Sequence, residues 1–157
     1  MYLDTLQLFS DAQALTVTAL ATNVIDLSVD RSIGTGEDMA VFFQVDVAAD
    51  LVTGDETYQF DVEYASNAGQ TTGRQLMGRR IFQAGTPTAP NQNANLLVAG
   101  FIFNMPVPKT VLSESEQFFG VRYTLSGTTP TLTITTWLAP MSMGQSYANY
   151  PKGYTIS

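Results

Sequence analysis

The chain has 157 residues, enough for one packed domain, and its 45% hydrophobic content excludes an intrinsically disordered protein. A net charge of −7 argues against a free-standing nucleic-acid binder, which would present a basic patch, and against a protein held on anionic membranes. Cysteine and histidine are both absent, which excludes disulfides, thiolate and imidazole metal sites, and the common nucleophile–base pairs of hydrolases.

Two further features of the sequence concern the location of the protein and its few arginine residues. The N-terminal residues lack the basic and apolar regions of a secretory signal, and no apolar run reaches about 18 residues. We therefore expect a protein that is made and used in the cytoplasm. The nearest approach to a basic patch, Arg74 with Gly78–Arg80, is interpreted as ordinary surface or ion-pair residues.

Hydrophobic and polar residues alternate along most of the chain, which is the period of a half-buried strand. The first such stretch alternates threonine with small apolar residues, and the clearest one places Gln59, Asp61 and Glu63 on its outward side. In chain order, we expect strands over 15–22, 25–30, 39–49, 58–65, 76–83, 96–108, 117–126 and 131–139.

These segments, separated by turns rich in glycine and proline, predict an all-β, jelly-roll-like β-sandwich of about eight antiparallel strands. Residues 96–108 are apolar on both faces, which favours a central buried strand. Ser126–Pro130 is expected to close a hairpin between the last two strands. Both ends carry apolar side chains that a lone monomer could not easily bury. The predicted organisation is therefore an arm over 1–13, a sandwich over 14–140 and a second arm over 141–157.

Two acidic groupings deserve a chemical test. Asp61 and Glu63 lie on one strand face and could form the carboxylate pair of a glycosidase, but the solvent-facing side of a sandwich explains them better. Asp50, Asp55 and Glu56 share a loop that could hold calcium, yet the loop lacks an EF-hand signature, and a solvated acidic loop is the simpler interpretation. We predict no catalytic residue, metal site or cofactor, and no enzyme.

Trp137 shares its strand parity with a row of threonines and is expected to face outward. An exposed aromatic residue marks a glycan site or a protein interface, and the nearby Met141 and Met143 suit an adaptable apolar contact. Capping of the core by Trp137 is the alternative interpretation. The C-terminal residues add Tyr147, Tyr150 and Tyr154 on a backbone rich in glycine, serine and proline, without periodicity.

Several short segments occur in a distinctive order. They are "FSDAQA" at Phe9–Ala14, a Thr/Ala alternation, "TNVIDL" at Thr22–Leu27, Arg31, "IGTGE" at Ile33–Glu37 and a final "GYTIS" at Gly153–Ser157. In this order they resemble the jelly-roll cement proteins of tailed bacteriophage heads, of the type on a Bordetella phage. The resemblance covers the N-terminal region and the tail, whereas the middle matches in strand pattern and length.

The resemblance implies a structural protein on the outer surface of a capsid, made in the host cytoplasm, that holds neighbouring major capsid protein subunits together at their junctions. The implied partners are the major capsid protein and further copies of the chain, as a dimer or trimer on local symmetry axes, with no nucleic acid and no membrane. A charged content of only 13% fits, since charged residues are depleted at interface cores.

The residues expected to contact the capsid or a neighbouring copy are apolar or aromatic side chains near the two ends. They are Leu6, Leu8, Phe9, Trp137, Met141, Met143, Tyr147, Tyr150 and Tyr154. A carbohydrate-binding β-sandwich module, with Trp137 and the tyrosines as its platform, is the alternative function.

Overall fold

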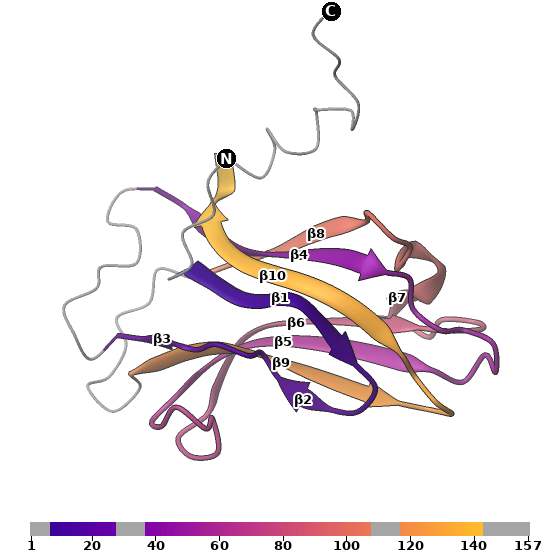
Figure 1. Cartoon of the computed structure of the whole chain (residues 1–157), viewed down its shortest axis with the longest axis horizontal. Coiled ribbons are helices and arrows are strands. Elements are labelled where there is room, and N and C mark those ends of the chain that lie inside the picture. Colours follow the sequence, from indigo (N-terminus) through magenta and orange to yellow (C-terminus); the bar gives the residue numbers. More distant parts are fainter. Residues whose placement is uncertain (1–6, 28–36, 108–116, 143–157) are drawn as a thin grey trace, which may run out of the picture.

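The computed structural model describes residues 7–27, 37–107 and 117–142, and these fold as a two-layer β-sandwich (Figure 1). A single-turn 3-10 helix at Ala94–Leu96 precedes β8. The ten strands are β1 (Leu8–Leu15), β2 (Ala19–Leu20), β3 (Ile25–Asp26), β4 (Met39–Val47), β5 (Thr57–Ala65), β6 (Gln75–Gln83), β7 (Gln92–Asn93), β8 (Ile102–Pro106), β9 (Phe118–Ser126) and β10 (Leu132–Pro140). In these ranges no helix is long and apolar enough to cross a membrane.

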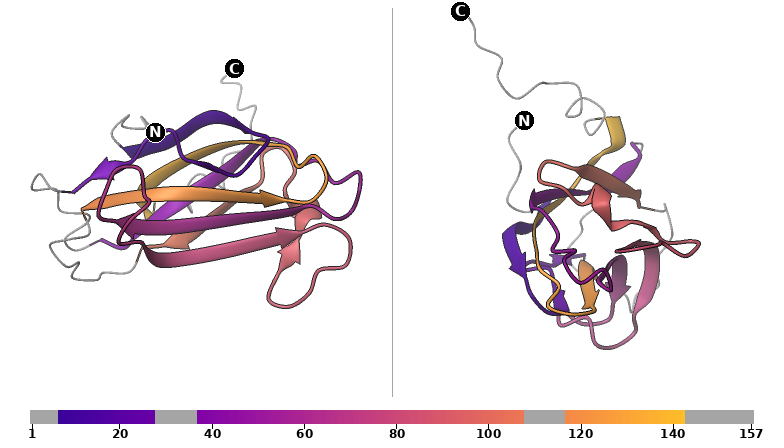
Figure 2. Two further views of the ribbon diagram at one scale, coloured as in Figure 1. Left: turned by 90° about the horizontal axis from the view of Figure 1, so that it is seen from below. Right: turned by 90° about the vertical axis from the view of Figure 1, so that its right-hand side faces the viewer.

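One sheet has the strand order β1-β10-β4-β8, and the other has the order β2-β9-β5-β6-β7, with β3 also paired to β9. The pairings are antiparallel except for the short β6–β7 contact, which is parallel. If β2 and β3 are counted as two halves of one strand and the two-residue β7 is left out, the remaining eight strands follow the jelly-roll order. Figure 2 shows the two layers from below and end-on. The predicted fold class is thus confirmed.

The inner faces of the two sheets meet in a cluster of aromatic rings. Phe60 of β5 lies at its centre and makes edge-to-face contacts with rings of both sheets. Its partners are Phe43 at 5.6 Å, Phe103 at 5.1 Å, Phe82 at 5.8 Å and Tyr123 at 6.0 Å between ring centroids. Each such pair contributes about 0.5–1.5 kcal/mol beyond the burial of its surface. The cluster therefore fixes how one sheet sits on the other.

The hairpin expected across Ser126–Pro130 is wrong. β9 and β10 belong to different sheets, so the short loop between them carries the chain from one layer to the other. The loop is tied down at both ends, because Asp50 N–H donates to the Thr131 carbonyl (2.9 Å) and Thr128 N–H donates to Asp55 (3.1 Å). Alternation identifies both strands but does not reveal which sheet each strand joins.

The central strand expected over 96–108 is also wrong. β8 covers only Ile102–Pro106 and lies at the edge of its sheet, next to β4. Residues before it form the 3-10 turn and a loop that leaves Leu96 and Val98 exposed. β8 is apolar on both sides because Phe103 and Met105 enter the main core while Ile102 packs on the outside of the sheet.

The predicted N-terminal arm is too long, because β1 already begins at Leu8 and pairs with β10. A bulge between Ser10 and Gln13, with Ala12 at φ 44°, interrupts the alternation there. The strand expected over 15–22 is instead a corner between β1 and β2. Gln13 stabilises it by accepting from Thr22 N–H (3.2 Å) and donating to the Leu20 carbonyl (2.9 Å). Residues 1–6 and 143–157 of the predicted arms lie outside the described residues.

Polar groups in the core link the two layers. The Tyr123 hydroxyl of β9 donates to Thr136 of β10 (2.8 Å) and shares a hydrogen bond with Ser10 of β1 (2.8 Å). The Tyr58 hydroxyl donates to the Asp50 carbonyl at 2.6 Å. Since a buried hydroxyl without a partner is costly, these bonds favour one relative position of the sheets.

We expect alkaline pH to unfold the protein through its buried tyrosines. Burial raises the pKa of Tyr58, Tyr64 and Tyr123 from 10.0 to about 12. The unfolded chain therefore loses these protons before the folded chain does, so stability is complete below pH 10.0 and falls as pH rises towards 12. Urea unfolding at a series of pH values measures this fall, and ultraviolet absorbance follows phenolate formation. Tyr123→Phe should make the fall less steep, and constant stability across this range would contradict the expectation.

Candidate interaction surfaces

A second apolar cluster lies on the outer face of the β1-β10-β4-β8 sheet. On β4 and β10, residues of this cluster alternate with residues of the main core, so they point away from it. Phe42 and Trp137 are opposite each other in register, and their rings stack at 5.7 Å with 17° between the planes. We call this set the outer cluster: Ala40, Phe42, Trp137 and Ala139, with Leu8, Ile102 and Met141 partly buried against them.

Three of the residues expected to contact a partner, Leu8, Trp137 and Met141, therefore come together on one face. Their contact with a partner stays a prediction. Leu6, Met143, Tyr147, Tyr150 and Tyr154 lie outside the described residues. Sequence reasoning missed Phe42 and Ile102. The consecutive pair Phe42–Phe43, which puts large apolar groups on both faces of one strand, was the available signal.

The prediction that Phe9 contacts a partner is wrong. Its side chain is fully buried in the main core, where it meets the edge of Phe119 at 5.4 Å. Because β1 begins at Leu8, alternation sends Leu8 to the outer cluster and Phe9 inward. Phe9 holds the chain's own first strand in place and presents no surface to a partner.

Trp137 faces the outer side of its sheet, as predicted, but only 3% of it is exposed. A sugar-binding platform needs an accessible ring face, and Phe42 lies against one face of this indole. The carbohydrate-binding alternative therefore loses the exposed aromatic residue on which it was based. The alternative in which Trp137 caps the main core does not describe its position either, since Trp137 packs in a separate cluster on the outer face of the sheet.

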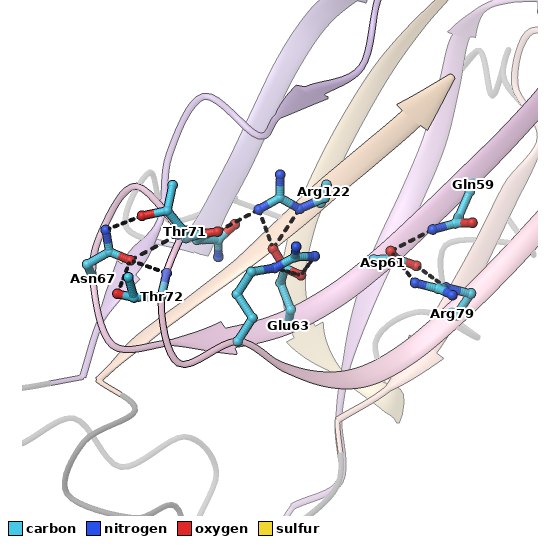
Figure 3. A network of polar contacts seen from close by, with 10 residues as sticks. Gln59, Asp61, Glu63, Asn67, Thr71, Thr72, Arg79 and Arg122 are labelled. Carbon is cyan, nitrogen blue, oxygen red and sulfur yellow. Dashed lines mark hydrogen bonds and ion pairs between the residues drawn. The ribbon is translucent and has the colours of Figure 1, made fainter. Parts of the chain in front are cut away.

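The outer face of the other sheet carries an ion-pair network (Figure 3). Asp61 of β5 accepts from Arg79 of β6 through both oxygens, with Nε–Oδ1 at 2.7 Å and Nη2–Oδ2 at 2.9 Å. Gln59 donates a third bond to Oδ2 at 2.7 Å. These charge-assisted bonds raise the pKa of the Arg79 guanidinium.

Glu63 lies between two further arginines. Arg74 donates to Oε2 through Nε (3.0 Å) and Nη2 (2.6 Å), and Arg122 of β9 donates to Oε1 through Nε (2.9 Å). Both carboxylates are only 1% exposed, whereas Arg74 and Arg79 are about half exposed. The expectation that Asp61 and Glu63 face solvent is thus wrong, because the longer arginine side chains cover them. The ion-pair interpretation of Arg74 and Arg79 is confirmed.

The loop between β5 and β6 closes over one end of this network. Its backbone is held by Arg122, which donates to the Gln70 carbonyl at 2.7 Å. Asn67 Oδ1 accepts from the N–H groups of Thr71 (3.0 Å) and Thr72 (3.2 Å). The Gln70 side chain is buried directly over Gly120, where a Cβ atom would overlap its amide. Glycine at 120 therefore makes room for the loop.

The acidic residues between β4 and β5 accept hydrogen bonds from their own loop and from the neighbouring loop after β9. Asp55 accepts from the Thr53 hydroxyl (2.7 Å) and from Thr128 N–H (3.1 Å), and these bonds lower the pKa of its carboxyl. Glu56 accepts from Thr53 N–H (3.1 Å) and hydroxyl, and Asp50 accepts from Val52 N–H (3.0 Å). Within the described ranges no three acidic side chains converge on a metal position, so the calcium interpretation gains no support.

Together these features define a β-sandwich protein of the jelly-roll class, with an apolar cluster on one outer face and an arginine–carboxylate network on the other. Residues 9–136 match the Bbp16 family. The chain belongs to the Bbp16 family, whose name points to a protein of a Bordetella phage. No curated protein matches the chain.

We expect Arg79→Ala to lower the free energy of unfolding by about 1–2 kcal/mol, because it leaves the Asp61 carboxylate without its bidentate partner, while the half-exposed position lets water replace part of the loss. Asp61→Asn combined with Arg79→Ala should cost less than the sum of the single changes. Urea unfolding of the four proteins of this cycle measures the coupling. Strict additivity would show that the pair contributes nothing to stability.

We expect Gly120→Ala to destabilise the protein by about 1–3 kcal/mol, since the new methyl group must displace Gln70. Gln70→Ala should cost little, because the Gln70 amide nitrogen is buried without a hydrogen-bond partner among the described residues. The double variant should recover most of the loss. Thermal unfolding of the three variants tests this, and a double variant as unstable as Gly120→Ala would mean that the methyl group meets something other than Gln70.

Proposed function

We propose that the protein is a capsid cement protein, structural rather than enzymatic, that binds the outer surface of a tailed-phage head at junctions between major capsid protein subunits. The observation that carries the proposal is the Bbp16 family match over 9–136, which spans almost the whole sandwich. The jelly-roll fold, which the strand pattern predicts and the cement-protein resemblance also implies, supports it.

The physical demand on such a protein also fits the sandwich. A shell under internal pressure has to be bridged by a rigid body that keeps its shape under load. The interlocked rings around Phe60 and the hydroxyl bonds of Tyr123 couple the two sheets, and arginine pairs brace the outer face of one of them. Binding by a preformed surface loses little conformational entropy, so modest contacts are sufficient when many copies act together.

We propose further copies of the same chain as the second partner. Dimers and trimers both have closed symmetry that suits the local axes of a shell, and dimers are favoured because twofold symmetry is the commonest among oligomers of one chain. Light scattering of the free protein measures the oligomer. A strictly monomeric protein in solution and on heads would contradict this part of the proposal.

The test is co-sedimentation of the purified protein with heads that lack it. We expect saturable binding, and decorated heads that withstand heat or low salt better than bare heads. Heads incubated with a heat-unfolded sample of the protein serve as the control. Failure of the folded protein to bind, or binding without any gain in head stability, would contradict the cement function.

Deletions separate the ends from the sandwich. Removing residues 1–6 or 143–157 takes away no described strand, so we expect each shortened protein to unfold at nearly the temperature of the full chain. Removing 1–13 should unfold the protein, because it deletes most of β1 together with Phe9. If capsid contacts lie in the predicted arms, the two folded deletions should bind heads more weakly. Full binding by both would restrict the contacts to the sandwich.

A further inference from the structure

The described chain has six exposed large aliphatic side chains, and five of them lie at one end of the sandwich. The six are Val17, Val47, Val52, Leu76, Leu96 and Val98. Leu76 lies near the start of β6, whereas the other five lie where β1 and β4 end and where β5, β8 and β10 begin, at the right of Figure 1. The loops at this end, 16–18, 48–56, 84–101 and 127–131, all belong to the described residues.

Four of these five side chains come from two neighbouring segments. Val47 is the last residue of β4 and Val52 follows it, while Leu96 and Val98 precede β8. Ala49 N–H donates to the Leu97 carbonyl (3.0 Å) and joins the two segments. Leu97 itself is buried in the core. We call Val47, Val52, Leu96 and Val98 the apolar end. Val17 lies at the same end, on the β1–β2 corner.

The apolar end is held in shape rather than left as loose loops. Asp50 N–H donates to Thr131 (2.9 Å), the Tyr58 hydroxyl donates to the Asp50 carbonyl (2.6 Å), and Gly100 N–H donates to Val45 (2.7 Å). The loop that carries Val52 is thus hydrogen-bonded to β5 and to Thr131, the residue before β10. The loop that carries Val98 is hydrogen-bonded to β4. Val52 is nonetheless 90% exposed. A fixed apolar surface of this kind, ordered without a partner, is typical of a protein-binding site.

The charged residues on the loops of the apolar end, Asp50, Asp55 and Glu56, are all acidic. Asp50 and Asp55 belong to its loops, and the hydrogen bonds that lower the pKa of Asp55 keep its carboxyl ionised. The arginines of the described chain lie elsewhere: Arg74 precedes β6, Arg79 and Arg80 are on β6, and Arg122 is on β9. A complementary partner would therefore pair an apolar centre with lysine or arginine at its rim.

We propose that the apolar end is the surface that docks onto a protein with an apolar centre and a lysine- or arginine-bearing rim. The inference rests on the proposed function, under which this partner is the capsid shell. The sandwich would then stand with this end on the shell, and the outer cluster and the arginine network would face sideways.

The test compares the full-length protein with three variants in co-sedimentation with heads that lack it. Val52→Ser combined with Val98→Ser removes two exposed methyl-bearing side chains from the apolar end. Leu76→Ser, an equally conservative change of an exposed aliphatic residue at the other end, is the matched control. Circular dichroism and thermal unfolding of each free protein verify the fold, and light scattering reports self-association.

We expect the double variant to bind heads at least tenfold more weakly and Leu76→Ser to bind like the unchanged protein. Asp50→Asn, which keeps the acceptor for Val52 N–H, should reduce the loss of binding caused by added salt. Equal binding by all variants, or equal weakening by Leu76→Ser, would overturn the inference while the cement function stands. Loss of a dimer in the double variant would assign the surface to a second copy instead. No binding by the unchanged protein would overturn both proposals.

Discussion

The two sheets are held together by aromatic rings that pack around Phe60, and this contact sets the relative position of their outer faces. Phe60 and Phe82 project from one sheet, and Phe43 and Phe103 project from the other. The edge-to-face contacts of Phe60 with the other three rings are satisfied in few relative positions of the sheets. The Tyr123 hydroxyl reaches across the same interface to β1 and β10. A sliding movement of one layer would break ring contacts and hydrogen bonds together, so the sandwich behaves as one rigid body.

The inner faces of the two sheets pack against each other, and the two outer faces differ in chemistry. One sheet buries Phe42 and Trp137 on its outside, and the other covers two carboxylates with arginines. Neither face is the plain polar exterior that strand alternation describes. The arginine network carries little net charge because its acids and bases lie side by side. It therefore braces the sheet while adding little net charge to that side of an acidic protein.

Alternation along the chain is sufficient to predict the fold class and the positions of β4, β5, β6, β9 and β10, because each of these strands turns one apolar face to the main core. It could not assign partners, so β9 and β10 were wrongly joined in a hairpin. The bulge at Ala12 interrupts the alternation of inward and outward side chains along β1, so the sequence pattern does not show where this strand begins. Phe9 is for this reason predicted as a docking residue, although it is buried. The covering of Asp61 and Glu63 depends on arginines that are distant in sequence, and no local pattern encodes it. Among the predicted contact residues, Leu8, Trp137 and Met141 came together through pairing between the first and last strands.

That pairing of first and last strands governs when the molecule can fold. β10 lies between β1 and β4, so it is an interior strand of its sheet although it is the last of the described strands to leave the ribosome. Until it emerges, β1 has no neighbour, and β4 has only β8, the short strand at the far edge. The nascent chain therefore cannot complete this layer before β10 has emerged, and folding has to wait for contacts between segments that are far apart in sequence, which form slowly. Under the proposed cement function, which needs many copies, the supply of folded subunits would then depend on this late step, and a truncated product ending before β10 would be unable to complete the sheet.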